Sequence, residues 1–349
     1  MPLGLYNATL NFETIDEIGQ EGRNSQVFLA HDKQLDGNLV VKKIPKDKLL
    51  NAQEYYKEAK ILYMSSHPYV VRVNYGCEND DHIFIAMPFY RNGSLKSLMA
   101  KKHLTIREVV RYAIQFLSGL HNIHSKGLIH FDVKPDNILI SDSNEALLSD
   151  FGLTKAMDDL GFANPHQVYN KQVPPEMFIG SSKTLQYNIY LAGLTLYRMV
   201  NGDQNFYDQF NFTTQADYVA AIKEGKFPNR DSYLPHVPQK MRKTINKALE
   251  VDTRDRYRNV LDLMNELGKI DDHLDWRYSL EENVKVWSKD LPNKKYMIKL
   301  SEVEGGKLEM STTKTMKESG NTTKVNDHSY SNATKSNITS KLNKVFREL

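Results

Sequence analysis

HFDVKPDNILISDSNEALLSDFG, residues 130–152, is the stretch that decides the fold. It contains two short apolar runs, residues 138–140 and 146–148, separated by the turn-rich sequence SDSNE. Apolar runs of this length on either side of a polar turn predict a small β-hairpin. Because a hairpin brings both of its ends to one edge, we expect Asn137 and Asp150 to converge there.

Four polar side chains flank this hairpin at fixed spacing. Asn137 and Asp150 offer oxygen atoms, and a hard cation such as Mg²⁺ prefers one or two protein oxygens together with water and substrate phosphates. Asp132 can then accept a proton or orient a nucleophile, and Lys134 can neutralise charge that develops on a transferred phosphoryl group. A single Asp before a short strand is usually a turn or capping residue, so the hypothesis depends on the four positions together.

HFDVKPDN and DFG resemble the catalytic-loop signature H-R-D-L-x-x-x-N and the metal-binding signature D-F-G of eukaryotic-type protein kinases. Phe131 stands where the family usually has an arginine. The spacing D-x-K-P-x-N resembles that of serine/threonine kinases, although Tyr169 occupies the place of a threonine common in their substrate loop. The resemblance implies an α+β, bilobal protein kinase fold with a β-rich N-lobe and a helical C-lobe.

The resemblance covers residues 12–270, about three quarters of the chain. It implies an N-lobe over residues 12–88, a hinge over 87–92 and a C-lobe over 93–270. Residues 281–349 follow as a small C-terminal α+β appendage of no recognised family, with short strands and a terminal helix from about Ile338. This accessory module carries 13 Lys and Arg against 9 Asp and Glu. We interpret that mild basic bias as a solvated surface, with an acidic partner or nucleic acid as the alternative.

Length and composition narrow the class of protein. The 349 residues, 40% of them hydrophobic, suffice for two packed lobes and an appendage, and the net charge of +3 indicates neither nucleic acid nor membrane. The single cysteine, Cys77, excludes an internal disulfide and fits a reducing, cytoplasmic compartment. The N-terminus lacks the pattern of a secretory signal. The most apolar segment, residues 189–200, is shorter than a bilayer span and contains Arg198.

The sequence of the first lobe predicts strands and one helix. Short β-branched or aromatic runs over residues 12–19, 25–33 and 38–44 predict strands, which resume over residues 69–76 and 82–89. Residues 51–65 have helical composition and spacing. By resemblance, Lys42 in VVKKI is the lysine that reaches nucleotide phosphates, and Glu58 on the predicted helix holds it. Lys43 is the rival for that role, and the register after the two valines favours Lys42.

The glycine-rich loop matches its family pattern weakly. In the register of G-x-G-x-x-G-x-V that ends at Val27, the glycine positions hold Gln20, Gly22 and Ser25. A one-residue insertion would recruit Gly19. Backbone amides approach phosphates most closely where no side chain intervenes. We therefore expect Gln20 and Ser25, which replace two of the glycines, to affect closure of the loop rather than nucleotide binding itself.

The segment IAMPFYRNGSL resembles the hinge between kinase lobes. The resemblance implies that Met87 gates the inner pocket and that the Pro88 carbonyl and the Tyr90 amide face the adenine edge of ATP. Three apolar side chains would hold the adenine ring between the lobes: Val27, Val40 and Leu139. The alternative, that these three are ordinary core residues, is compatible with such a role.

The C-lobe contains a long predicted helix over residues 105–125, capped by Thr105 and ended near Gly127. Two histidines of this helix, His121 and His124, are predicted to be surface or packing residues rather than metal ligands. By resemblance, His130 packs against Phe151 of DFG.

The activation segment, residues 153–176, contains Thr154 and Tyr169 as its only hydroxyl side chains. Phe131 cannot bind a phosphorylated loop as the family arginine does, so we expect activity without activation-loop phosphorylation. PPEMF resembles the A-P-E element, which implies a buried ion pair between its Glu176 and Arg256. By resemblance, Asn188 stands where the family usually has an aspartate that ties the catalytic loop to a buried helix, and it keeps the ability to accept hydrogen bonds.

The sequence thus predicts an ATP-dependent, Mg²⁺-assisted serine/threonine protein kinase that acts on a protein substrate. Autophosphorylation of the Ser- and Thr-rich C-terminal module is a further hypothesis. Two alternatives stay open. A nucleotide-binding pseudokinase scaffold is suggested by the sparse glycine loop and Asn188. A small-molecule phosphotransferase of related fold is disfavoured by the K-P-D-N string and the PPE element.

Overall fold

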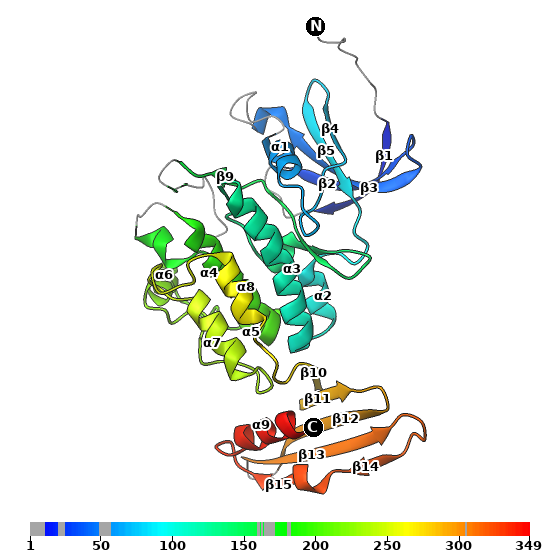
Figure 1. Cartoon of the computed structure of the whole chain (residues 1–349), viewed down its shortest axis with the longest axis vertical. Coiled ribbons are helices and arrows are strands. Elements are labelled where there is room, and N and C mark those ends of the chain that lie inside the picture. The colour runs from blue at the N-terminus through cyan, green and yellow to red at the C-terminus, as the bar shows by residue number, and fades with distance from the viewer. Residues whose placement is uncertain are drawn as a thin grey trace.

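The computed structural model describes residues 11–19, 25–48, 57–158, 161, 163, 172–179, 183–303 and 306–349, without the side chains of residues 57–59. Figure 1 shows three parts that follow one another along the chain: a β-rich lobe, a helical lobe and a second sheet with the C-terminal helix. The expected bilobal α+β kinase fold with a C-terminal appendage is confirmed. In the part of the chain that the structure describes, no helix is both long enough and apolar enough to cross a membrane.

The first lobe is an antiparallel five-stranded sheet in the order β1-β2-β3-β5-β4. Its alternating side chains bury a small core of Ala30, Leu39, Val41 and Ala86 on one face. The elements are β1 (Phe12–Gly19), β2 (Gln26–Asp32), β3 (Gly37–Pro45), β4 (Tyr75–Glu78) and β5 (His82–Pro88), with η1 (Lys46–Lys48) and α1 (Lys57–Met64) between β3 and β4.

The strand expected over residues 69–76 is wrong for most of its length, because β4 begins only at Tyr75. The backbone before it bonds to the other lobe. The Val71 amide donates to the Leu148 carbonyl at 2.9 Å, and the Leu148 amide donates to the Tyr69 carbonyl at 3.0 Å. The β-branched residues here are therefore extended without joining the first sheet, and they connect the two lobes.

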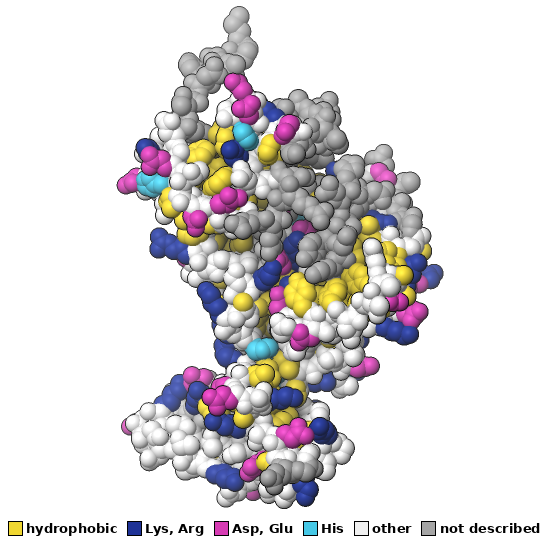
Figure 2. Space-filling view, turned by 180° about the vertical axis from the view of Figure 1, so that it is seen from behind, with side chains coloured by type: hydrophobic (Ala, Val, Ile, Leu, Met, Phe, Trp, Pro, Cys, Tyr) yellow, Lys and Arg dark blue, Asp and Glu magenta, His cyan; other side chains and the backbone are white. Residues whose placement is uncertain are grey.

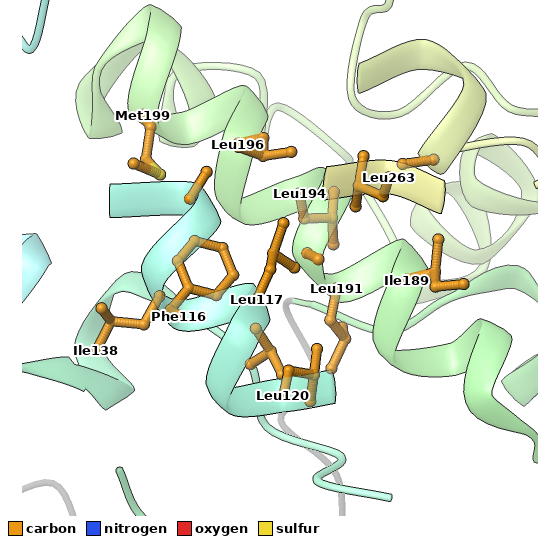
Figure 3. Close-up of a cluster of buried hydrophobic side chains, with 14 of the residues drawn as sticks. Phe116, Leu117, Leu120, Ile138, Ile189, Leu191, Leu194, Leu196, Met199 and Leu263 are labelled. Carbon is orange, nitrogen blue, oxygen red and sulfur yellow. The ribbon is translucent and has the colours of Figure 1, made fainter. Parts of the chain in front are cut away.

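The C-lobe is built around two long helices, α3 (Ile106–Ser125) and α4 (Leu185–Asn201). Thr105 and Glu108 form a capping box that satisfies the first amides of α3. The apolar face of α3 packs on α4, which is buried along nearly its whole length, as Figure 3 shows for Phe116, Leu117 and Leu194. This buried pair of helices is the platform on which the catalytic loop rests.

Shorter elements surround this platform. The helices are α2 (Leu95–Lys101), α5 (Asp203–Tyr207), α6 (Gln215–Lys223), α7 (Gln239–Ala248) and α8 (Val260–Leu267). The strands and 3₁₀ turns are β6 (Leu128–Ile129), η3 (Pro135–Asn137), β7 (Ile138–Ile140), β8 (Ala146–Leu148), β9 (Lys155–Ala156) and η4 (Pro175–Phe178). Strands β7 and β8 pair in antiparallel fashion, so the hairpin expected from the sequence is confirmed.

The C-terminal module is a second antiparallel sheet with one helix packed on it. The predicted kinase domain ends at residue 270 and the predicted module begins at residue 281. The first strand of the module starts between these two positions, at Trp276. The order is β10-β11-β12-β13-β14, and β15 also pairs with β13. The bounds are β10 (Trp276–Glu281), β11 (Val284–Asp290), β12 (Lys294–Val303), β13 (Lys307–Met316), β14 (Thr322–Lys324), η6 (Asn326–His328), β15 (Tyr330–Ala333) and α9 (Ile338–Glu348).

Charged side chains join the module to the N-terminal end of α3. Arg107 makes a bidentate ion pair with Asp275, at 2.6 and 3.0 Å. Arg277 donates to the His103 carbonyl at 2.9 Å and lies 3.3 Å from Glu108. The module is therefore attached to the helix whose other end leads into the catalytic loop.

A buried histidine completes this junction. The Trp287 indole N–H donates to Nδ1 of His236 at 3.2 Å, and His273 bonds to the His236 carbonyl at 3.1 Å. His236 is fully buried, and burial lowers its pKa to about 3. An imidazole that accepts a hydrogen bond at Nδ1 must stay neutral to keep that bond.

We expect this histidine to make the fold acid-sensitive. Its pKa is lower in the folded than in the unfolded chain, where it is about 6.5, so stability is lost as the pH falls below 6.5 toward 3. Lowering the pH from 7.5 to 5.5 should cost about 1 kcal/mol of unfolding free energy through this group. His236→Gln, whose amide oxygen can accept from Trp287, should lose that share of the pH dependence in urea unfolding. A constant stability difference between the two proteins at both pH values would contradict the prediction.

Candidate active site

The catalytic loop is anchored through His130. Its backbone amide donates to Oδ1 of Asn188 at 2.9 Å, and its Nε2 lies 3.0 Å from the Ser149 carbonyl. Its ring meets the Phe151 ring edge-on at 4.9 Å between centroids, as expected from the sequence. His130 therefore connects α4, the end of the hairpin and the DFG segment at one buried point.

Asn188 replaces a charged residue with a neutral one that still makes the anchoring bonds. Besides the His130 amide, its Oδ1 lies 3.0 Å from Nε2 of His124. Burial lowers the pKa of His124 to about 4, so the imidazole is neutral and can donate to an uncharged amide. The expectation that Asn188 accepts hydrogen bonds is confirmed, and His124 is a buried packing residue as expected.

Asp132, Lys134 and Asn137 lie together in the loop. The Asn137 amide nitrogen donates to Oδ2 of Asp132 at 2.7 Å and to the Asp132 backbone carbonyl at 2.9 Å. The Lys134 ammonium lies 3.0 Å from the same carboxylate oxygen. The carboxylate is thereby held in one orientation by a donor at the end of η3 and a cation on the loop.

Asp150 meets the N-lobe lysine. Nζ of Lys42, on β3, donates to Oδ1 of Asp150 at 3.2 Å. The nearby ammonium lowers the pKa of Asp150 to about 2, so this carboxylate stays ionised at any physiological pH. The Ser149 amide donates to the Asn137 carbonyl at 2.9 Å, which places the residues before and after the hairpin side by side.

Two residues that flank the site have left-handed backbone. Phe131 has φ of 66° and Asp150 has φ of 57°, a region that non-glycine residues seldom adopt. Phe131 is buried, with its ring edge-on to Tyr187 at 5.0 Å between centroids. The packing of Phe131 on Tyr187 and the contact of Asp150 with Lys42 hold these two conformations.

The candidate nucleotide side chains lie on the strands around Lys42. Val27 is the register partner of Lys42 across β2 and β3, and Val40 is that of Met87 across β3 and β5. Pro88 is the last residue of β5. Tyr90 lies in the hinge that follows, where burial raises the pKa of its hydroxyl. Leu139 is on β7 of the other lobe. All six are partly exposed, as residues beside a ligand should be.

Gly19 has a steric reason to be glycine. It pairs with Val27 between β1 and β2, where a Cβ atom would lie 2.8 Å from the valine Cβ. Gly22, the side chain of Glu58 and Tyr169 lie outside the described residues. The pairing of Lys42 with Glu58 therefore stays a prediction.

The ion pair expected between Glu176 and Arg256 is confirmed. The two carboxylate oxygens accept from the guanidinium at 2.9 and 2.7 Å, and both side chains are buried. Arg256 also donates to the carbonyls of Glu250 and Gln186. The pair fixes η4, which carries the PPE element, to the core of the C-lobe.

Sequence reasoning missed the role of Arg198. It had appeared only as an interruption in an apolar segment, but the structure buries it completely. It forms a bidentate pair with Asp203, at 2.6 and 2.9 Å, and lies 3.6 Å from Asp136 of the catalytic loop. Lys96 binds the other oxygen of Asp136 at 2.7 Å. The sequence did contain a signal for this pair: a single arginine within an apolar helix, followed five residues later by an aspartate.

The candidate oxygen donors suit a magnesium ion held jointly with phosphates. Among the described residues no group of three or more His, Cys, Asp or Glu side chains could hold a metal without other ligands. Asp150 supplies an ionised carboxylate, and the amide oxygen of Asn137 is available because the nitrogen makes both bonds to Asp132. One or two protein oxygens are the usual protein share of a magnesium site that includes substrate phosphates.

Comparison with known families matches residues 12–266 to the protein kinase domain. The chain belongs to this family. Similar curated proteins include probable serine/threonine-protein kinases of Lactococcus lactis, 28% identical over 266 residues, and of Clostridium perfringens, 30% identical over 266 residues. The serine/threonine-protein kinase PknD of Protochlamydia amoebophila is 26% identical over 293 residues. The resemblance to eukaryotic-type protein kinases is thus confirmed.

The alignments cover similar shares of this kinase chain. The alignments with the Lactococcus lactis, Clostridium perfringens and Protochlamydia amoebophila proteins cover 74%, 74% and 73% of this chain. They cover only 41%, 38% and 29% of those three proteins. The chain therefore spans less than half the length of the relatives it matches. Members of the family generally use ATP with Mg²⁺.

Proposed function

We propose that this kinase transfers the γ-phosphoryl group of ATP to a serine or threonine hydroxyl of a protein. The observation that carries the proposal is the contact between Lys42 of the N-lobe and Asp150 at 3.2 Å, beside an Asp132 held by Lys134 and Asn137. Phosphoryl transfer needs positioned charges more than covalent chemistry, and these side chains bring both signs of charge together.

Each residue has a role in this proposal. Lys42 binds the phosphates of ATP, and Asp132 accepts the hydroxyl proton or orients the hydroxyl. Lys134 neutralises charge on the transferred group. Asn137 and Asp150 hold Mg²⁺, which when bound neutralises phosphate charge and orients the phosphates.

The remaining candidate residues would bind the nucleotide. Val27, Val40 and Leu139 hold the adenine ring, with Met87 beside it and the backbone of Pro88 and Tyr90 at its edge. Gly19 and Gly22 border the phosphates, and Glu58 holds Lys42. In this scheme residues 12–270 form the kinase domain, and the accessory module, predicted over residues 281–349, begins with β10 at Trp276.

Transfer of radiolabel from γ-labelled ATP tests the proposal. The full chain with Mg²⁺ should label itself or casein, and acid hydrolysis should release phosphoserine or phosphothreonine. Binding of ATP without transfer to any acceptor would support a pseudokinase scaffold. Label that appears only in small molecules would support a small-molecule phosphotransferase. Mapping of the labelled sites would show whether the C-terminal module is a substrate of its own kinase.

Activity should not depend on phosphorylation of the activation segment. Phe131 is buried against Tyr187 and offers no cation to a phosphate, whereas the family arginine would. Phosphatase treatment of the protein should therefore change kcat by less than about twofold in a steady-state assay, far below the tenfold that 1.4 kcal/mol represents. Loss of activity that returns on re-phosphorylation at Thr154 or Tyr169 would contradict this.

The proposal also covers the binding partner and the cellular location of the protein. A protein substrate is its main partner, and a cytoplasmic location agrees with the single cysteine Cys77, which is unpaired. No nucleic acid or membrane partner is invoked. The basic bias of the C-terminal module is assigned to solvated surface.

A further inference from the structure

Three polar side chains of α4 contact the catalytic loop at successive positions. Asn188 accepts a hydrogen bond from the His130 amide at 2.9 Å, and the Thr195 hydroxyl lies 3.3 Å from the Val133 carbonyl. The third side chain is Arg198, which reaches the end of the loop. Helical positions seven and three residues apart lie on one face, and this stripe spans about 15 Å along the helix. Helix α4 therefore supports the loop along its length, not only at its start.

Arg198 is the member of this stripe that carries a charge. Its Nη2 lies 3.6 Å from Oδ2 of Asp136, which is part of η3. Asn188, by contrast, is neutral and holds the start of the loop by hydrogen bonds alone. Attraction between opposite charges is strongest where water is excluded. The ion pair between α4 and the loop thus lies at the end of the loop.

The guanidinium of Arg198 is held firmly by its surroundings. Figure 2 shows Lys and Arg side chains spread over the surface of the molecule, where water solvates them, whereas Arg198 is fully buried. Its neighbours Leu196 and Met199 belong to the packed apolar cluster of Figure 3. Arg198 donates to both oxygens of Asp203, at 2.6 and 2.9 Å, and its guanidinium carbon lies 5.5 Å from the centroid of the Phe206 ring. A cation fixed in this way can fix the carboxylate that it contacts.

Asp136 passes this restraint to the proposed active site. Lys96 of α2 donates to its other oxygen at 2.7 Å, but the Lys96 side chain is partly exposed, so that pair alone is weak. The next residue, Asn137, donates to the Asp132 carboxylate at 2.7 Å. Its backbone amide also donates to the Lys134 carbonyl at 3.0 Å. A shift of Asp136 would therefore move Asn137 away from Asp132.

We propose that Arg198 is a positioning residue, which acts through Asp136 to hold Asn137 against the Asp132 carboxylate. The inference rests on the proposed function and adds a determinant of its rate: a buried cation outside the site that fixes the end of the catalytic loop. It also explains how the loop keeps its place when Asn188 at its start is neutral. A pair with Asp203 alone would join only α4 to α5, so the contact with Asp136 is the one to test.

Hydrogen exchange of the full chain, without nucleotide, measures the positioning directly. In Arg198→Met and in Asp136→Asn, peptides from residues 130–141 should exchange about tenfold faster, because the loop has lost its ion pair with α4. Peptides from residues 106–125, in α3, should keep their exchange rates within about twofold. Asp136→Asn leaves the pair between Arg198 and Asp203 intact, so it is the milder of the two changes.

Steady-state kinetics show whether this position matters for transfer. Each variant should lower kcat by about tenfold, since small misplacements of reacting groups are costly, while KM for ATP should stay within about twofold because Lys42 and Asp150 are unchanged. The two changes break the same contact, so the double variant should lose no more than the single variants. Lys101→Met removes an exposed cation of α2 and should match the unaltered chain in both measurements.

The outcomes that contradict the inference are distinct. Unchanged exchange over residues 130–141 would show that Arg198 does not hold the loop. Equal acceleration in α3 would show that it contributes only general stability. Losses of kcat that multiply in the double variant would show that Arg198 does not act through Asp136. No label transfer by the unaltered chain would instead overturn the proposed function, and this inference with it, whatever the exchange rates.

Discussion

Asp132→Asn is expected to lower kcat for phosphoryl transfer by about 10² to 10⁴-fold, the usual contribution of a positioned general base. The amide matches the carboxylate in size, but its oxygen is needed by Asn137, which donates to Oδ2 at 2.7 Å. The amide nitrogen must then face the substrate, where it donates and cannot accept the hydroxyl proton. Lys134, 3.0 Å from the same oxygen, also loses its anionic partner. The loss is measured as the initial rate of label transfer from ATP.

Two comparisons separate this effect from misfolding. Asp142→Asn makes the same change in the exposed turn of the same hairpin and should leave the rate unaltered. ATP affinity of Asp132→Asn, measured by calorimetry with Mg²⁺, should stay within a few fold, since Lys42 and Asp150 are untouched. Full transfer activity in Asp132→Asn would remove Asp132 from the mechanism.

Local sequence patterns predicted the parts of the fold that depend on neighbouring residues. The hairpin followed from two apolar runs and a polar turn, and α3 from helical spacing with a capping threonine, because both signals act within a few residues. The terminal helix expected from Ile338 is α9 for the same reason. The resemblance assigned Lys42 to the nucleotide phosphates and Asp150 to Mg²⁺, but it did not predict their direct contact, which joins residues 108 apart.

Contacts without a local signature were not predictable in this way. Arg198 has a local partner in Asp203, but its contact with Asp136 joins two different elements and has no local signature. The Arg107–Asp275 pair joins residues 168 apart, so no local pattern reveals the junction with the C-terminal module. Residues 69–76 have strand composition, but the competing hydrogen bonds of Tyr69 and Val71 to the other lobe determine their path.

The Glu176–Arg256 pair should produce the largest stability effect of any single substitution considered for this chain. Arg256→Met is expected to lower the free energy of unfolding by about 3 to 5 kcal/mol, because it leaves the buried Glu176 carboxylate without its cation. It also removes the donor to the Glu250 and Gln186 carbonyls, which have no other side-chain partner among the described contacts. Urea unfolding followed by circular dichroism measures the loss.

A double-mutant cycle identifies the pair as the cause. Glu176→Leu leaves Arg256 charged and buried, while the double variant with Arg256→Met removes both charges, so its cost should fall short of the two single costs combined by about 1 to 3 kcal/mol. Arg258→Met, an exposed arginine two residues later, should change stability by less than about 0.5 kcal/mol. Strictly additive single costs would show that the two side chains act independently. The PPE element would then be held by the surrounding packing.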